Sequence, residues 1–329
     1  MLHSILFVFI HSQNNQLPPA YKALCQELRD HNTEVLSFLE QSPSASEQLL
    51  TTFANTHDSS HSLLVSNNPA VLQAGTKLGL FGVGYSTDET FLPAKYCFED
   101  FKNVNYSYFS EISKRYRGEP ISILSTRHLQ IRELCRQDLP ALYEIYKKPS
   151  SLAYMEEELE DFETFYEKKC AYLDSIYSFY HFGIWGVFLK EDGSLIGECG
   201  IEPVSIHEQE EISIGYLLDP AYQHKGYGKE MVQAVLRYAK RHFEITHIIA
   251  KIQAENAASI ALAKSCKMTW NKRYTAENRT YEIYTWDAPV SGIPNPVQAA
   301  TATEKVYSQF QANPDTSTYG KRYTRKTPL

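Results

Sequence analysis

A short glycine-containing segment in the second half of the chain has the composition of an anion-binding loop. The segment is Gln223-His224-Lys225-Gly226-Tyr227-Gly228-Lys229, and it joins a predicted strand to a predicted helix. Glycines at the start of a helix let several backbone N–H groups approach one point, and the helix dipole adds positive potential there. Lys225 and Lys229 would neutralise the charge of bound phosphate. We therefore expect the segment to bind a diphosphate, and a plain glycine turn that caps a helix is the alternative.

The spacing within this segment differs from that of two common phosphate-binding motifs. Gln223 stands three residues before Gly226, which gives the pattern Gln-x-x-Gly-x-Gly. A dinucleotide-binding fold would carry Gly-x-Gly-x-x-Gly, and a P-loop would carry Gly-Lys-Ser/Thr. The pattern therefore favours the diphosphate of coenzyme A over NAD or ATP.

The elements that position the loop are predicted from apolar alternation and helical spacing. A strand ends at Asp219-Pro220 just before the loop, and an amphipathic helix follows it. The predicted elements of this half are helix Glu156–Tyr177, strands Phe182–Lys190, Leu195–Val204 and Glu211–Leu218, helix Glu230–His242, strand His247–Gln253, helix Ala257–Cys266 and strand Tyr281–Trp286.

Residues 124–287 resemble the GNAT superfamily of N-acetyltransferases. The run from Ile214 to Pro220, with the Gln223–Gly228 segment after it, looks like strand 4 and the pyrophosphate loop of that family. Asn256-Ala257-Ala258-Ser259 looks like the family's Asn-x-x-Ser element. The opening strand and helix, Leu129–Tyr146, are similar to the ribosomal-protein-alanine acetyltransferase subgroup. The resemblance implies an α/β (α+β) fold, with a mixed sheet and flanking helices.

The resemblance also implies how acetyl-CoA would bind as acyl donor. Strands 4 and 5 diverge, and the pantetheine arm pairs with the backbone of Tyr216, Leu217 and Leu218. Asn256 and Ser259 lie beside that arm. A primary amine attacks the thioester directly, with no metal, while a backbone N–H near Leu217 polarises the carbonyl.

Carboxylates on the strand before the loop are the candidates for proton transfer. Glu211 and Ser213 share one face of this strand, since side chains alternate. Related transferases often carry Glu where Ser213 stands, so Glu211 or Glu210 is expected to act one step earlier through water. Glu202, at the end of the neighbouring strand, is the rival. Relatives place a Tyr and then Leu-Gly-Phe after the Asn-x-x-Ser element. This chain has no Tyr there before Tyr274, and Cys266-Lys267-Met268 stands in place of Leu-Gly-Phe.

The first 120 residues alternate strand-like and helix-like stretches and predict a small, mostly parallel open sheet. Ser62–Tyr85 faintly resembles part of a haloacid-dehalogenase-like fold. That family needs an Asp nucleophile and acidic Mg²⁺ ligands, whereas His11-Ser12 and Ser66-Asn67-Asn68 stand at the corresponding strand ends. We expect a degenerate hydrolase-like domain without phosphatase activity.

The composition narrows the class of protein further. The chain has 329 residues and a formal net charge of −7, which gives no general attraction to nucleic acid or to an anionic membrane. Its six cysteines form no Cys-x-x-Cys pair and indicate reduced thiols rather than disulfides or a zinc site. We expect a cytoplasmic protein with no metal, nucleic-acid or membrane partner, and leave a homodimer open.

Together these features predict an acyl-CoA-dependent N-acyltransferase that transfers acetyl from acetyl-CoA to a primary amine, on a small molecule or a protein N-terminus. A catalytically weak acyl-CoA-binding sensor or scaffold is the alternative, because the usual Tyr and Leu-Gly-Phe are absent. The expected domains are a hydrolase-like domain at 1–120, a transferase domain at 121–288 and a disordered tail at 289–329.

Overall fold

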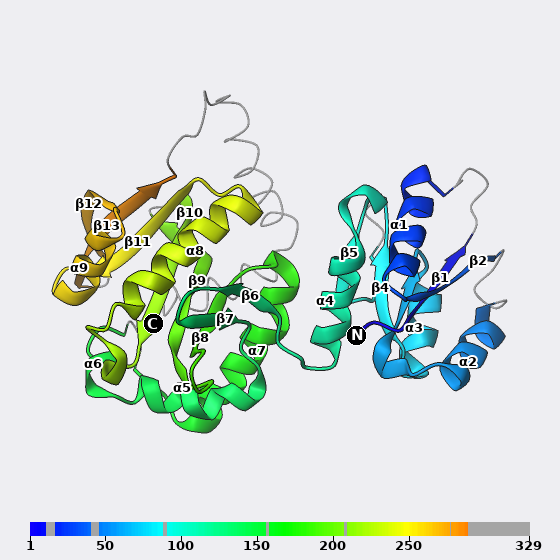
Figure 1. The fold of residues 1–329 in the computed structure, drawn as a ribbon, viewed down its shortest axis with the longest axis horizontal. Coiled ribbons are helices and arrows are strands. Elements are labelled where there is room, and N and C mark those ends of the chain that lie inside the picture. The colour runs from blue at the N-terminus through cyan, green and yellow to red at the C-terminus, as the bar shows by residue number, and fades with distance from the viewer. Residues whose placement is uncertain are drawn as a thin grey trace, which may run out of the picture. The chain divides into compact units, whose positions relative to one another are not determined.

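The computed structural model describes residues 1–10, 17–40, 46–87, 91–155, 158–206, 209–276 and 278–288 (Figure 1). The chain divides into two compact units, Met1–Ile121 and Ser122–Leu329. The predicted tail at 289–329 lies outside the described residues.

The first unit is built on a five-stranded parallel sheet with the order β2-β1-β3-β4-β5. Its strands are β1 (Ser4–Ile10), β2 (Glu34–Glu40), β3 (Ser62–Ser66), β4 (Phe81–Tyr85) and β5 (Tyr96–Phe98). Strand β1 is buried on both faces, as expected for the centre of a parallel sheet that helices cover on both sides. The alternating apolar pattern of this half therefore predicted its architecture correctly.

Two helices cover each face of this sheet. The helices are α1 (Pro19–Asp30), α2 (Ser46–Thr56), α3 (Pro69–Lys77) and α4 (Tyr106–Tyr116). Phe7 of β1 packs in one core with residues of α1 and α4, whereas Leu6 packs in a second core with residues of α2 and α3. The period-two alternation of β1 thus separates the two cores.

The second unit is built on an eight-stranded mixed sheet with the order β12-β13-β11-β10-β9-β8-β7-β6. Its strands are β6 (Ser122–Ser125), β7 (Leu129–Arg132), β8 (Ile184–Leu189), β9 (Leu195–Ile206), β10 (Gln209–Leu218), β11 (His247–Gln253), β12 (Thr269–Ala276) and β13 (Arg279–Asp287). Neighbouring strands are antiparallel except for the parallel pair β10 and β11.

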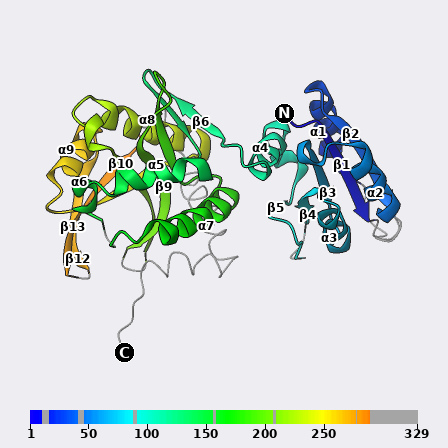
Figure 2. The same ribbon diagram turned by 90° about the horizontal axis from the view of Figure 1, so that it is seen from below.

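Helices lie on both faces of this mixed sheet (Figure 2). They are α5 (Leu139–Tyr146), α6 (Pro149–Leu152), α7 (Phe162–Tyr180), α8 (Tyr227–Phe243) and α9 (Ala257–Ser265). Apolar residues of α8 pack with Ile212 and Ile214 of β10 in the main core. The opposite face of β9 contacts α5 and α7 through Glu198.

Two sequence predictions for this unit were wrong. The helix predicted from Glu156 begins at Phe162, because Asp161 caps it by accepting a hydrogen bond from the Thr164 N–H at 2.9 Å; residues 158–160 are not helical, and 156–157 lie outside the described residues. The sheet ends at β12, not at the predicted strand Tyr281–Trp286. Residues of this edge strand are largely polar and mostly exposed, so they carry little hydrophobic signal.

Candidate active site

The parallel pair β10 and β11 diverges beside the predicted loop. Strand β10 pairs with β9 along its whole length, but it pairs with β11 only where Ser213 stands opposite Ile249. The backbone of Tyr216, Leu217 and Leu218 is therefore bound into the sheet on the β9 side alone. Beyond Ser213 the divergence leaves an edge of β10 that pairs with no strand of the described residues.

The predicted loop lies between β10 and α8 and has an unusual backbone. His224 and Gly226 both adopt left-handed conformations, with φ values of 59° and 88°. The first backbone bond within α8 runs from the Glu230 N–H to the Gly226 carbonyl oxygen at 3.1 Å. The N–H groups of Tyr227, Gly228 and Lys229 precede it and have no acceptor within the helix. Such a turn into a helix N-terminus forms a concavity that suits an anion.

Two side-chain contacts lie at the start of the loop. The Gln223 side-chain amide donates to the Leu218 carbonyl oxygen at 3.1 Å, which ties the loop to the end of β10. The Lys225 ammonium lies over the Tyr222 ring, 5.1 Å from its centre. Gln223 therefore holds the start of the loop against the end of β10.

The predicted Asn-x-x-Ser element lies across the divergence from β10. Asn256 caps α9 by accepting a hydrogen bond from the Ser259 N–H at 3.0 Å. The Tyr216 hydroxyl donates to the Ser259 carbonyl oxygen at 3.2 Å. Burial raises the pKa of Tyr216, so this hydroxyl remains a donor at neutral pH. The contact links β10 to α9 on the α8 side of the sheet.

The candidate proton-transfer residues lie on the other face of β10. Ser213 is buried and stands opposite Glu202 of β9, so the two side chains share one face. A β-carbon on Gly215 would lie 3.9 Å from Oε1 of Glu202, which places that carboxylate over Gly215. Glu202 thus lies within β9, not at its end as predicted. Glu211 lies near the start of β10, where its carboxylate is 3.8 Å from Nε2 of His247.

Comparison with known proteins identifies the family. Residues 128–269 match the family model described as acetyltransferase (GNAT) domain. The uncharacterized N-acetyltransferase YnaD of Bacillus subtilis (strain 168) is 30% identical over 148 residues, which cover 44% of this chain and 81% of that protein. The chain belongs to the GNAT acetyltransferase family. It is thus an acyl-CoA-dependent N-acetyltransferase, and nothing in these comparisons favours the non-catalytic sensor.

Two further similar proteins were found. The uncharacterized protein YkkB of the same organism is 30% identical over 105 residues, covering 32% of this chain and 61% of that protein. A solved structure of an acetyltransferase (GNAT family) from Bacillus anthracis is 22% identical, with a TM-score of 0.43 and coverage of 50% of this chain and 96% of that one.

The GNAT unit contains a buried polar cluster that the sequence did not predict. Glu198 of β9 accepts a short hydrogen bond from the Tyr146 hydroxyl, and its other oxygen lies 3.2 Å from Nζ of Lys169. Glu198 stands opposite Leu217, so the cluster lies on the face that carries Ser213 and Glu202. Burial and the nearby Glu198 carboxylate raise the pKa of Tyr146. Its members come from β9, α5 and α7, and no local spacing indicates their contact.

The segment around α6 contacts the strand ends where β10 and β11 diverge. The Lys148 ammonium lies 2.6 Å from both carboxylate oxygens of Asp219 at the end of β10. The Gln253 side-chain amide donates to the Tyr154 carbonyl oxygen at 3.1 Å, and Arg279 donates to the Met155 carbonyl oxygen at 2.8 Å. This segment therefore bridges the ends of β10, β11 and β13. Sequence analysis missed it because the contacting residues lie 71 to 124 positions apart.

Two further observations concern metals and membranes. Among the described residues, one group has three possible metal-ligand side chains close together: His3, Asp58 and His61 of the first unit. Asp58 already accepts hydrogen bonds from Ser60 and lies 2.8 Å from Nδ1 of His61, so the cluster acts as a turn cap. Of the helices that the structure describes, none combines the length and the apolar character that a membrane crossing requires.

Proposed function

We propose that this GNAT unit binds acetyl-CoA with its diphosphate on the loop from Gln223 to Lys229. Its pantetheine arm would run along Tyr216–Leu218, beside Asn256 and Ser259. Three observations support this arrangement: the left-handed turns at His224 and Gly226, the helix N-terminus that follows them, and the unpaired edge of β10. The bound donor would supply an acetyl thioester, and the chain supplies binding, orientation and proton transfer.

Glu202 is the residue that the geometry favours as proton acceptor. Its carboxylate lies over Gly215, two residues before Leu217, whose N–H is the candidate donor to the thioester carbonyl. Glu211 stands four residues before Gly215, which is about 13 Å along an extended strand. It also lies beside His247. Glu202 is therefore the better placed of the two carboxylates, with Ser213 as its buried neighbour.

The transfer is written as direct attack in a ternary complex. The N–C bond forms as the C–S bond breaks, and the acceptor ammonium loses two protons in all. The leaving thiolate takes up one proton, and the other is released to solvent through Glu202 and water. Neither a covalent acyl-enzyme nor a nucleophile of the chain enters this sequence.

A cationic amine is the acceptor class that the charges favour. Glu198 and Glu202 place two carboxylates on the acceptor face, whereas Lys169 is the ammonium that pairs with Glu198. Carboxylates on this face attract a cation. A small polyamine and a protein N-terminus, as in the ribosomal-protein-alanine subgroup, both satisfy this requirement.

Calorimetry and a turnover assay test the function together. Acetyl-CoA should bind at one site per chain, and a panel of polyamines and N-terminal peptides should reveal amine-dependent thiol release. Absence of binding at millimolar acetyl-CoA would exclude the proposed donor site. Binding without turnover on any amine would favour the sensor.

Matched glutamine variants test the role of Glu202. Glu202→Gln should lower kcat by about 100-fold or more, which is the usual contribution of a general base. The acetyl-CoA Kd should remain unchanged. Glu211→Gln is the control and should retain most activity. The opposite ranking of the two variants would assign the proton to Glu211.

The first unit is proposed to be a degenerate domain for packing, dimerisation or binding. The carboxyl ends of its strands, where open α/β sheets bind ligands, carry no carboxylate at the two expected positions. Asn67 accepts a hydrogen bond from the Ile10 N–H at 2.9 Å, and Asn68 caps α3. Both side chains thus have structural partners. Assay with a generic phosphate ester and Mg²⁺ should show no turnover, and robust activity would overturn this role.

A further inference from the structure

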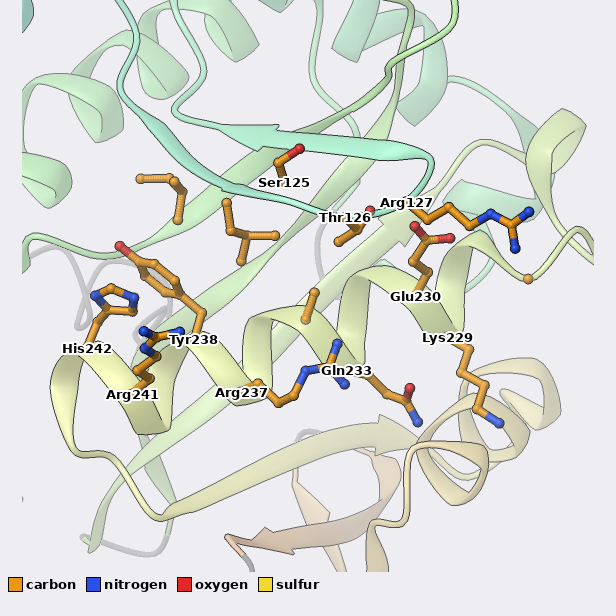
Figure 3. A pocket seen from close by; sticks show the side chains of 14 residues that line it. Ser125, Thr126, Arg127, Lys229, Glu230, Gln233, Arg237, Tyr238, Arg241 and His242 are labelled. Carbon is orange, nitrogen blue, oxygen red and sulfur yellow. The ribbon is translucent and has the colours of Figure 1, made fainter.

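A second groove lies on the GNAT unit, between the edge strand β6 and the outer side of α8 (Figure 3). Its volume is about 790 Å³. Ile123 and Leu124 of β6, with Ala234 and Tyr238 of α8, form its apolar wall. These four residues lie outside the proposed acetyl-CoA arm and the proton-transfer site, whereas Gly226 and Lys229, at one end of the groove, also belong to the proposed diphosphate loop.

One row of side chains along α8 makes this groove cationic. Lys229, Gln233, Arg237 and Arg241 follow one another at intervals of four residues, and all of them line the groove (Figure 3). Four residues of helix rise by about 6 Å, so the row is about 18 Å long. Arg127 adds a further cation from the segment after β6. The local charge is therefore opposite to the net charge of −7 of the whole chain.

The cations of this groove have no anionic partner within the described part of the chain. Lys229, Arg237, Arg241 and Arg127 form no ion pair with the residues that the structure describes. Glu230 is the one carboxylate of the lining, and it already lies 2.8 Å from Nδ1 of His128. The cationic side chains thus remain available for an external anion.

Helix stability alone does not explain this row. Like charges four residues apart, as at Arg237 and Arg241, destabilise a helix by several tenths of a kcal/mol. The helix dipole favours cations in the last turn, which accounts for Arg241 alone. Lys229 lies in the first turn, where the dipole opposes a cation. The diphosphate proposed for the loop offsets the cost at Lys229, and an anion bound in the groove would offset the cost at Arg237 and Arg241.

The opposite wall of the groove provides a strand edge. β6 is the last strand in the sheet order, so its outer edge pairs with no strand of the described chain. The register between Ser122 and Leu124 shifts, which leaves Ile123 outside the ladder with β7. An extended peptide beside β6 would pair with its backbone and place alternate side chains toward α8.

We propose that this groove binds an acidic segment of a partner protein as an added β-strand. Side chains on one face of a strand repeat every two residues, at about 6.7 Å. This repeat matches the spacing of about 6 Å along the α8 row, so side chains at alternate positions would meet Gln233, Arg237 and Arg241 in turn, with carboxylates on the two arginines. The chain's own last residues do not fit, because Lys321, Arg322, Arg325 and Lys326 make that segment basic.

Two fluorescent peptides of equal composition test the proposed pattern. The peptide Thr-Glu-Val-Glu-Thr-Glu-Val-Glu has alternating carboxylates, and Thr-Val-Thr-Val-Glu-Glu-Glu-Glu has clustered ones. Fluorescence anisotropy with the full chain at low salt should show tighter binding of the alternating peptide. N-methylation of its backbone, which blocks strand pairing, should weaken binding as well. Equal affinity for the two peptides would contradict an added strand.

Charge-reversal variants of adjacent helix residues test the site. Arg237→Glu and Arg241→Glu should each raise the Kd of the alternating peptide about fivefold or more. Lys240→Glu makes the same charge change on α8 outside the groove, and it should leave the Kd nearly unchanged. An equal loss in all three variants would indicate general charge attraction and overturn the site.

Competition separates the peptide from other anions. Excess acetyl-CoA should leave in place the peptide binding that depends on Arg237 and Arg241, and full displacement by it would make the groove part of the donor site. Single-stranded oligouridylate should bind more weakly than the peptide. Tighter binding of the oligonucleotide that also depends on Arg237 would assign the groove to nucleic acid instead. Neither result depends on transferase activity.

Discussion

Replacing Gly226 with alanine should weaken acetyl-CoA binding more than it destabilises the fold. Gly226 has a φ of +88°, a conformation that residues with a β-carbon rarely adopt. A β-carbon there would meet no atom within 4 Å, so its cost is conformational and not steric crowding. That cost is about 1–2 kcal/mol.

The effect on binding follows from how the loop relieves this strain. A shift of φ toward negative values turns the N–H groups around Gly226 away from their common point. Each charge-assisted hydrogen bond contributes about 1.5–3 kcal/mol, so loss of one raises the Kd by about 10- to 150-fold.

Gly193 provides the matched control for this prediction. It has a φ of +74°, it lies in the turn between β8 and β9, and a β-carbon added to it would likewise meet no atom within 4 Å. Thermal denaturation should show a similar loss of Tm in Gly193→Ala and Gly226→Ala. Calorimetry with acetyl-CoA should show lost affinity in Gly226→Ala alone. Wild-type affinity in Gly226→Ala would refute the assignment of the loop.

Two further variants test the packing of the GNAT unit. Burial opposes ionisation of Asp138, but hydrogen bonds from Arg132 at 2.7 and 2.8 Å outweigh it and lower the pKa of Asp138. The carboxyl of Asp138 has a pKa of about 3.9 in the unfolded chain and a lower pKa in the folded protein. The ion pair therefore contributes its full stability above about pH 3.9, and this contribution is lost as the pH falls through the folded-state pKa. Asp138→Asn should lower the free energy of unfolding, measured in urea at pH 7, by about 3 kcal/mol. The stability of this variant should also depend less on pH below pH 4, and an unchanged pH dependence would contradict the prediction. Gly200→Ala should cost about 3 kcal/mol or more, because its β-carbon would lie 1.9 Å from the Gly183 carbonyl oxygen, and a wild-type Tm would contradict it.

Local patterns predicted the elements whose signal lies in neighbouring residues. Strand His247–Gln253 has the predicted ends, because its apolar residues are bounded by polar ones on both sides. The loop at Gln223–Lys229 was found from glycine spacing next to a strand and a helix. The start of α7 was misplaced, since the acidic run before it resembles a solvated helix face.

Features that depend on strand register were not accessible from the sequence. Glu202 stands opposite Ser213 only because β9 pairs with β10 in one particular register. Tyr146 and Glu198 are 52 positions apart, and their contact follows from helix packing on the sheet. The cation spacing of α8 is visible in the sequence, whereas the β6 wall that makes it a groove is not.

A crystal structure with coenzyme A tests the central claim most directly. The diphosphate should accept hydrogen bonds from backbone N–H groups of the Gln223–Lys229 loop, and the pantetheine should pair with the edge of β10 at Tyr216–Leu218. The thiol should lie on the side of the sheet that carries Glu202. Coenzyme A bound elsewhere, with β10 and β11 closed together, would contradict the account.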